Sequence, residues 1–299
     1  VLGDCIRRLK TPGTPLEEAM AVADILMNLK RTATLGEGQH QLLKDTLKKA
    51  IGLAEEAKAA GASRLHIVTS PRKDLSNLLG DHSWLKEKRP NLDGVLLAPF
   101  ADVEVHIHVQ KVPLGLGNAI QSALHAIEGP FLVLLGDNLL IDHHSTLESF
   151  VPSQASAELV KSFAKHGRPC AAMMAVEPGE VSNYGVVRME DSRIVEIVEK
   201  PTPEQAPSNL VLCGRYVFTS DASTLLDHYD VETHGELQSI ALQQHWMKND
   251  GMYGVVLDGF QWYDSGKPLP WLKAQVDHAL RREDMSDAFR AWLIERLNE

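Results

Sequence analysis

Short apolar runs alternate with segments of helical periodicity along most of the chain. Helical spacing of apolar residues predicts helices at 41–60, 115–126, 157–166, 237–247, 270–281 and 286–297. Apolar runs of strand length lie between them, at residues 65–69, 131–135, 171–176 and 253–257. Gly61 stands where the C-terminal cap of the first helix is expected. This order predicts an α/β domain in which helices cover a sheet.

Residues 103–109 alternate strictly between apolar and polar side chains. Valine and isoleucine occupy the odd positions, and Glu104, His106 and His108 occupy the even ones. A strand with one solvated face has this pattern. We therefore expect His106 and His108 at the surface.

The sequence pattern changes after residue 180, where short expected strands are separated by turns. The expected strands lie at residues 184–188, 194–198 and 210–218 and predict an antiparallel excursion from the α/β pattern. No internal repeat, low-complexity segment or linker is recognisable, so the pattern favours one domain over residues 1–299. Residues 1–39 are the least readable, with helical character at 16–30 and no obvious strand.

The composition is that of an ordinary globular protein, with 44% hydrophobic and 23% charged residues among 299. A net charge of −10 argues against a protein that coats nucleic acid, because phosphate binding needs a basic surface. The charge is uneven: residues 1–100 carry 15 basic and 12 acidic side chains, whereas residues 101–299 carry 15 and 28. A site for a polyanion is therefore expected to draw on the first third.

Cysteine usage and hydropathy indicate where the protein works. Cys5, Cys170 and Cys213 are too widely spaced to predict a disulfide framework or a metal knuckle, which favours a reducing compartment, and Cys170 is expected in the core. No apolar run approaches the length of a membrane span, and the N-terminus shows no signal peptide. We expect a cytoplasmic protein with neither membrane nor nucleic acid as a partner.

Glycines at a strand-to-helix junction form the first candidate for chemistry. The segment GLGN at 115–118 follows an expected strand and opens a helix, where bare backbone N–H groups can approach a ligand and the helix dipole favours an anion. A tight turn that needs two flexible residues is an equally good interpretation.

Two carboxylates follow expected strands, at Asp137 and Asp264. Ligands bind beyond the carboxyl ends of strands in open α/β sheets, so these side chains are placed to hold Mg²⁺ together with phosphate oxygens. The alternative is that Asp137 caps a turn. Lys200 ends a short strand and could meet a phosphate, although a solvated lysine is the usual case. Gly185, next to Tyr184, leaves room for a flat or ring-shaped ligand.

Taken in order, these pieces resemble the bacterial UTP–glucose-1-phosphate uridylyltransferases, also called UDP-glucose pyrophosphorylases, of the sugar nucleotidyltransferase superfamily. The similarity covers roughly residues 40–299, and the segment at 206–217 separates this family from its thymidylyl and guanylyl relatives. The matching stretches are Gln110 with GLGNA (115–119), LGDN (135–138), NYGVV (183–187), VEKP (198–201), APSNL (206–210), GRYV (214–217), GELQ (235–238), YDSGK (263–267) and FRAWL (289–293).

The resemblance implies a Rossmann-like three-layer fold around a mixed, mostly parallel sheet. It implies transfer of the uridylyl group of UTP to glucose 1-phosphate, which gives UDP-glucose and pyrophosphate by a Mg²⁺-dependent in-line displacement. Residues 40–140 would form the nucleotide-binding half and residues 141–299 the sugar-phosphate-binding half, after an atypical segment at 1–39. A homo-oligomer is expected.

The resemblance also implies roles for individual residues. Gln110 and the backbone at Gly115 would read the uracil edge, Asp137 and Asp264 would hold Mg²⁺, and Lys200 would meet the sugar phosphate. Gly185, Glu199 and Gly214 would line the glucose. Four further positions are expected to bind substrate: Gly117, Tyr184, Asn209 and Glu236.

The first forty residues depart from the family pattern. Members begin with a glycine-rich loop, G-x-G-T-R, that cradles the triphosphate, followed by a Pro-Lys-Glu-Met stretch. No such loop is recognisable in residues 1–39, and Glu17 or Glu18 stands where a lysine would be needed. The alternative function is therefore a weak or inactive homologue that binds a sugar nucleotide or a partner subunit.

Overall fold

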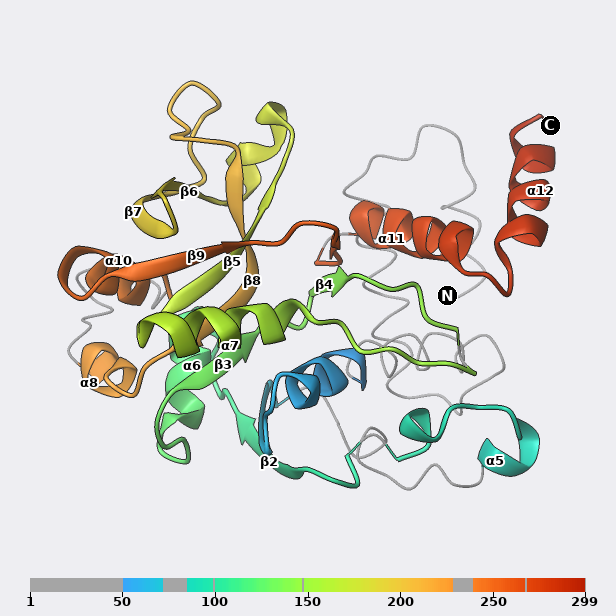
Figure 1. Cartoon of the computed structure of the whole chain (residues 1–299), viewed down its shortest axis with the longest axis horizontal. Coiled ribbons are helices and arrows are strands. Elements are labelled where there is room, and N and C mark those ends of the chain that lie inside the picture. Colours follow the sequence, from blue (N-terminus) through green and yellow to red (C-terminus); the bar gives the residue numbers. More distant parts are fainter. Residues whose placement is uncertain are drawn as a thin grey trace.

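The computed structural model describes residues 51–71, 85–98, 100–146, 148–227, 239–266 and 268–298. The strands of these described residues form one six-stranded sheet and two separate strand pairs (Figure 1). The strands of the large sheet stand in the order β3-β8-β5-β9-β7-β6, with an additional pairing between β8 and β6. Their bounds are β3 (Phe131–Leu134), β5 (Cys170–Ala175), β6 (Gly185–Glu190), β7 (Arg193–Glu199), β8 (Leu210–Phe218) and β9 (Met252–Val256).

Helices cover both faces of the six-stranded sheet. Alternate residues of β5 mark the two faces: Met173 packs with α10 (Ile240–Asn249), α8 (Ala222–Asp227) and α6 (Leu116–Leu124), whereas Cys170 packs with α7 (Ala155–His166). Each face carries its own buried cluster, with Trp246 of α10 in one and Leu159 of α7 in the other, both 0% exposed. The predicted three layers and the buried Cys170 are therefore confirmed.

The sheet is mixed, but the expected majority of parallel pairs is wrong for the described strands. Only β5–β9 in the large sheet and the separate pair β1 (Arg64–Thr69) and β2 (Glu104–Val109) run parallel among them. The other described pairings are antiparallel, because β7 and β8 run opposite to the remaining strands of the large sheet and the separate partners β4 and β10 run opposite to each other. The antiparallel excursion expected after residue 180 is the β6–β7 hairpin and β8.

The surface position expected from the alternation at 103–109 is wrong for His108, whereas the side chain of His106 is 39% exposed. His108 is only 9% exposed, whereas Ile107 and Val109 on the other face of β2 are 44% and 48% exposed. The histidine face is covered because His66 of β1 and His125, which follows α6, pack against it, with ring centroids 5.2 and 5.3 Å from His108. His106 also stacks on His66, at 4.9 Å. These four histidines therefore form a histidine cluster beneath α6.

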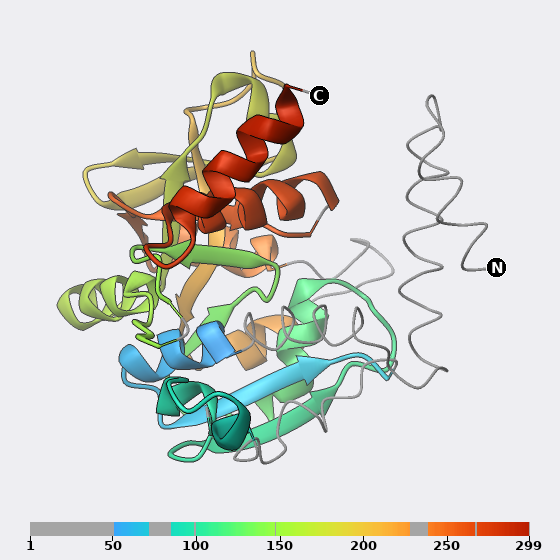
Figure 2. The ribbon, with the colours of Figure 1, turned by 90° about the vertical axis from the view of Figure 1, so that its right-hand side faces the viewer.

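The second strand pair lies between the sheet and the C-terminal helices. Strand β4 (Asn138–Ile141) pairs antiparallel with β10 (Gln261–Asp264), and the chain continues into α11 (Pro268–Arg281) and α12 (Ser286–Leu297). The hydroxyl of Tyr263 donates to the carboxylate of Asp277 on α11, which attaches this helix to β10. Figure 2 shows α11 and α12 at the opposite end of the molecule from β1 and β2.

The remaining described elements are short, and most helix boundaries agree with the sequence prediction. Residues 51–59 are helical, and Gly61 has a φ of 96° and donates to the carbonyl of Lys58, as expected of a cap. None of the described helices is long and apolar enough to span a bilayer. The short elements are α5 (Leu85–Lys88), η1 (Gly94–Leu96) and η2 (Pro178–Asn183).

Candidate active site

The carboxylates of Asp137 and Asp264 face the same small space beside Gly266. A Cβ atom placed on Gly266 would lie 3.1 Å from Asp137 Oδ2 and 3.2 Å from Asp264 Oδ1. The space therefore exists because residue 266 has no side chain. The structure brings together the two residues predicted to bind Mg²⁺, although 127 positions separate them in the sequence.

Strand pairing brings these carboxylates together. Asn138 stands opposite Asp264 in the β4–β10 ladder, so Asp137 lies beside the end of β10. The backbone N–H of Ser265 donates to the carbonyl of Asp137 at 2.7 Å, and the Ser265 hydroxyl donates to the same oxygen at 2.6 Å. The N–H of Gly266 donates to Asp264 Oδ1 at 3.0 Å, which orients that carboxylate.

Residues 135–138, which we name the carboxylate turn, connect β3 to β4. Asn138 Nδ2 donates to Asp137 Oδ1 at 2.8 Å, and the indole N–H of Trp262 donates to Asn138 Oδ1 at 2.7 Å. The indole can only donate, so it sets the orientation of the Asn138 amide. The amide in turn leaves Asp137 Oδ2 free to face Gly266.

Trp262 also connects the carboxylates to the expected sugar-binding residues. Its ring lies 4.8 Å from the ring of Tyr184, measured between centroids. Burial raises the pKa of Tyr184 above its ordinary value, and the negative charges of Asp264 and Glu180 add to the effect. The indole of Trp262 thus links Tyr184 to Asn138, which orients Asp137.

Four predicted substrate-binding residues lie at the open end of the β6–β7 hairpin, away from its turn. We name them the hairpin end: Tyr184, Gly185, Glu199 and Lys200. Gly185 stands opposite Glu199, and a Cβ on Gly185 would lie 3.1 Å from Glu199 Oε2. Lys200 has a φ of 46°, a left-handed conformation that is uncommon for a non-glycine residue and occurs at turns and functional sites. Its N–H donates to the Tyr184 carbonyl at 3.0 Å, and its Nζ lies 3.7 Å from Glu199 Oε1.

Gly214 belongs to the carboxylate side of the site. It has a φ of 79°, and a Cβ there would lie 3.1 Å from the side chain of Asn138. Its carbonyl accepts the N–H of Leu135 at 3.0 Å, which ties β8 to the start of the carboxylate turn. Gly214 therefore contacts the expected metal ligands through Asn138.

The residues expected to read the uracil form a separate local group. Gln110 Nε2 donates to the carbonyl of Gly115 at 3.2 Å and to Asn118 Oδ1 at 2.9 Å. Gly115 has a φ of 100° and precedes α6 as its N-cap, where it supplies no capping side chain, and Gly117 is buried within that helix. GLGN therefore forms a turn into α6 that the Gln110 side chain closes, and its role in ligand binding stays a prediction.

Asn209 does not belong to these groups. Asn209 is exposed before β8, and its Nδ2 donates to the carbonyl of Val176 at 3.4 Å. Glu236 and the segment at 1–39 lie outside the described residues.

Sequence reasoning did not identify Trp262 or Arg215 as parts of this site. Arg215 is 0% exposed and donates to the carbonyl of Asn138 at 2.9 Å. A signal was available for both residues. A charged residue within an apolar strand pattern is seldom buried unless it is paired, and tryptophan two positions before Asp264 points to the same side of its strand.

The described residues fit a divalent cation that also contacts a substrate. Mg²⁺ is commonly held by one or two carboxylates together with substrate phosphates. Asp137 and Asp264 supply two carboxylates around a space that a side chain on Gly266 would fill. Within the part of the chain that the structure describes, no group of three or more histidine, cysteine or acidic residues could hold a metal by itself.

Comparisons with known proteins place the chain in a family. The nucleotidyl transferase family matches residues 53–279, so the chain belongs to that family of enzymes. The chain is 29% identical over 253 residues to UTP–glucose-1-phosphate uridylyltransferase YngB of Bacillus subtilis, covering 81% of this chain and 82% of YngB. It is 28% identical over 255 residues to UTP–glucose-1-phosphate uridylyltransferase of Streptococcus pneumoniae, covering 81% and 83%.

Solved structures agree with this assignment. A UDP-glucose pyrophosphorylase complexed with UDP-glucose superposes with a TM-score of 0.65 at 26% identity, covering 78% of this chain and 87% of that one. A UTP-bound enzyme from Acinetobacter baumannii has a TM-score of 0.66 at 24% identity, covering 83% and 87%, and supports the fold. The mixed α/β nucleotidyltransferase fold is thus confirmed.

Proposed function

We propose that this protein transfers the uridylyl group of UTP to glucose 1-phosphate, giving UDP-glucose and pyrophosphate. The observation that carries the proposal is the pair Asp137 and Asp264 around Gly266, joined through Trp262 to Tyr184 at the hairpin end. The similarity to enzymes named for this reaction supports the choice of UTP and glucose 1-phosphate.

The chain's own residues would position the reactants. Lys200 would meet the phosphate of glucose 1-phosphate, while Gly185 and Glu199 would line the sugar. Gln110 and Gly115 would read the uracil, so the nucleotide would lie on residues 40–140 and the sugar phosphate on residues 141–299. The attacking phosphate oxygen is ionised near neutral pH, so the reaction needs position and charge neutralisation rather than a general base.

We propose Mg²⁺ as the divalent cation, with Asp137 and Asp264 as its protein ligands. When bound, it would neutralise charge on the phosphates of UTP and on the departing pyrophosphate. Hard carboxylate oxygens suit this ion, and the space beside Gly266 leaves access for phosphate oxygens.

Pyrophosphate release tests the proposed reaction. The protein is incubated with UTP, glucose 1-phosphate and Mg²⁺, with a chelator-treated sample as the blank and with dTTP and GTP as alternative nucleotides. We expect release that depends on metal and is fastest with UTP. UDP-glucose binding by calorimetry without any release would favour the binding homologue instead. Faster pyrophosphate release with dTTP or GTP would show that this nucleotide, and not UTP, is the substrate.

A further inference from the structure

We infer that Arg215 is a positioning residue that holds the carboxylate turn, and hence Asp137, in the geometry needed for cation binding. The inference rests on the proposed function, because it assigns Asp137 to the metal. Arg215 itself lies behind the turn and is 0% exposed, so it acts through the backbone rather than by touching a substrate.

Every N–H group of the Arg215 guanidinium has an acceptor. The Nε donates to Glu56 Oε1 at 2.8 Å and Nη2 donates to Glu56 Oε2 at 3.0 Å, so the ion pair is bidentate. Nη2 also donates to the Asn138 carbonyl at 2.9 Å, while Nη1 donates to the carbonyls of Gly214 at 3.1 Å and Leu135 at 3.5 Å. The five donors of arginine are thus all used, and a lysine has only three.

The acceptors include both ends of the carboxylate turn. Leu135 and Asn138 are its first and last residues, and the Asn138 N–H also donates to the Leu135 carbonyl at 3.2 Å. Asp137 lies between them, so its backbone cannot move without breaking bonds to Arg215. The side chain of Asn138 then orients the Asp137 carboxylate at 2.8 Å. The guanidinium therefore acts together with the bonds from Ser265 to fix where this carboxylate lies relative to Asp264.

Glu56 connects the turn to two distant helices. It lies in the helical residues 51–59, is 2% exposed, and its Oε1 also accepts the hydroxyl of Ser156 on α7 at 2.6 Å. Burying an ion pair removes two charges from water, and hydrophobic residues often give equal stability in such places. A pair whose donors converge on backbone carbonyls beside the candidate metal ligand is better explained by positioning than by stability.

The test measures Mn²⁺ binding by electron paramagnetic resonance in the presence of saturating UDP-glucose. The variants are Arg215→Lys and Glu56→Gln in the full chain. We expect the Mn²⁺ dissociation constant to rise about 10- to 100-fold in Arg215→Lys, as for other partners that orient metal ligands, and less in Glu56→Gln, which keeps one acceptor. Unfolding in guanidinium chloride is measured in parallel.

The matched control is Trp246→Phe, in the core on the other face of the sheet. It removes the bond from Trp246 Nε1 to Asp221 Oδ2, 2.8 Å long, and should lower stability while leaving Mn²⁺ affinity unchanged. The inference would be overturned if Arg215→Lys bound Mn²⁺ as tightly as the wild type, or if Trp246→Phe weakened Mn²⁺ binding as much as Arg215→Lys. If Arg215→Lys fails to fold, the Mn²⁺ affinity of Glu56→Gln tests the inference instead. If both variants lose cooperative unfolding, the Arg215–Glu56 ion pair has a structural role only and the inference is wrong. A wild-type protein that binds Mn²⁺ and UDP-glucose but releases no pyrophosphate would count against the proposed function alone.

Discussion

The carboxylate turn and the hairpin end lie side by side but are supported differently. Groups distant in the sequence hold the turn: Gly214 and Arg215 of β8, Glu56 through that arginine, and Trp262 and Ser265 near β10. The hairpin end is held by its own strands, and the side chains of Glu199 and Lys200 are 52% and 62% exposed. The carboxylate turn, which would bind a cation, is thus held in place by buried residues. The hairpin end, which would bind the sugar phosphate, is exposed to solvent.

This contrast predicts which substitutions act on the metal and which on the sugar. At the turn, loss of a ligand or of a supporting bond should weaken cation binding. At the hairpin end, loss of a side chain should raise the KM for glucose 1-phosphate and leave cation affinity unchanged.

The largest effect is expected from Asp264→Asn. The amide keeps the shape of the side chain but removes a negative charge from the candidate cation site. Turnover with Mg²⁺ should fall more than about 100-fold, since loss of a direct ligand should exceed the cost of losing an outer partner. Pyrophosphate release measures the change, and wild-type turnover would show that Asp264 only accepts the Gly266 N–H.

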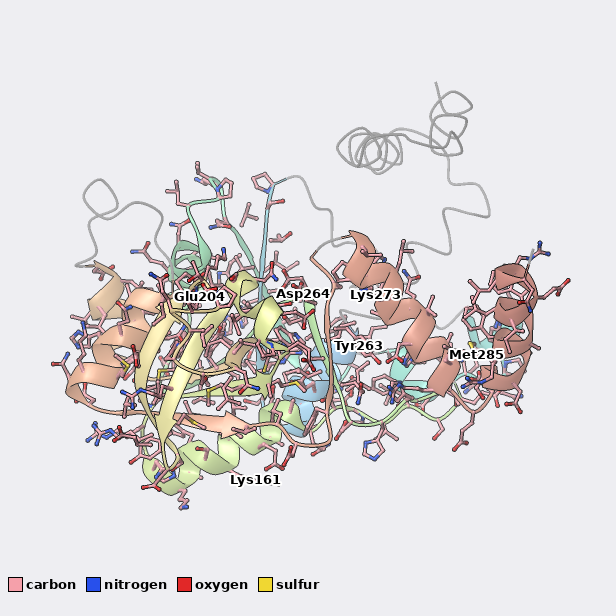
Figure 3. The ribbon with its side chains drawn as sticks, turned by 90° about the horizontal axis from the view of Figure 1, so that it is seen from above. Lys161, Glu204, Tyr263, Asp264, Lys273 and Met285 are labelled. Carbon is pink, nitrogen blue, oxygen red and sulfur yellow. The ribbon has the colours of Figure 1, made fainter. Side chains whose placement is uncertain are left out.

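Lys200→Met should have the next largest effect. A charge-assisted bond to a phosphate contributes about 1.5–3 kcal/mol, so the KM for glucose 1-phosphate should rise about 10- to 100-fold. Lys161→Met is the control, because Lys161 is 71% exposed on α7 and lies well apart from Asp264 (Figure 3). An unchanged KM for glucose 1-phosphate in Lys200→Met would show that Lys200 is a solvated lysine that does not contact the phosphate.

Trp262→Phe should act more weakly and on the metal. Phenylalanine keeps a ring beside Tyr184 but cannot donate to Asn138 Oδ1, so the Asn138 amide loses its set orientation. The Mn²⁺ dissociation constant should rise by about 10-fold, the lower end for partners that orient metal ligands. A change confined to the KM for glucose 1-phosphate would mean that Trp262 belongs with the hairpin end instead.

The smallest effect is expected from the histidine cluster, which lies outside both parts of the site. Burial lowers the pKa of both His66 and His108, and neighbouring histidines lower both pKa values further. The charge of Arg64 also lowers the pKa of His66, whereas Glu104 raises it. The unfolded chain therefore binds more protons just below pH 6.5, so stability falls as the pH drops through that value. Thermal unfolding between pH 7.5 and 5.5 should show this decline, and His108→Gln should make it shallower. An equal slope in His108→Gln would assign the decline to other groups.

The same contrast explains what the sequence could predict. The hairpin end and Gly61 depend on neighbours close in sequence, and these elements and caps were expected where they occur. Arg215 and Glu56 are 159 positions apart, and Trp262 and Asn138 are 124 apart, so no local pattern joins them. The position of His108 was mispredicted because alternation shows that a strand has two faces but not which face a helix covers.

Mn²⁺ binding by Gly266→Ala, compared with Gly136→Ala, tests most directly whether Asp137 and Asp264 hold a cation together. Alanine at 266 places a methyl group 3.1 and 3.2 Å from their oxygens without removing either charge, whereas a Cβ at 136 meets nothing within 4 Å. Neither glycine has a left-handed backbone, so strain does not separate the two variants. We predict that Gly266→Ala raises the Mn²⁺ dissociation constant more than about 10-fold and that Gly136→Ala matches the wild type. Wild-type affinity in Gly266→Ala would contradict a shared cation site.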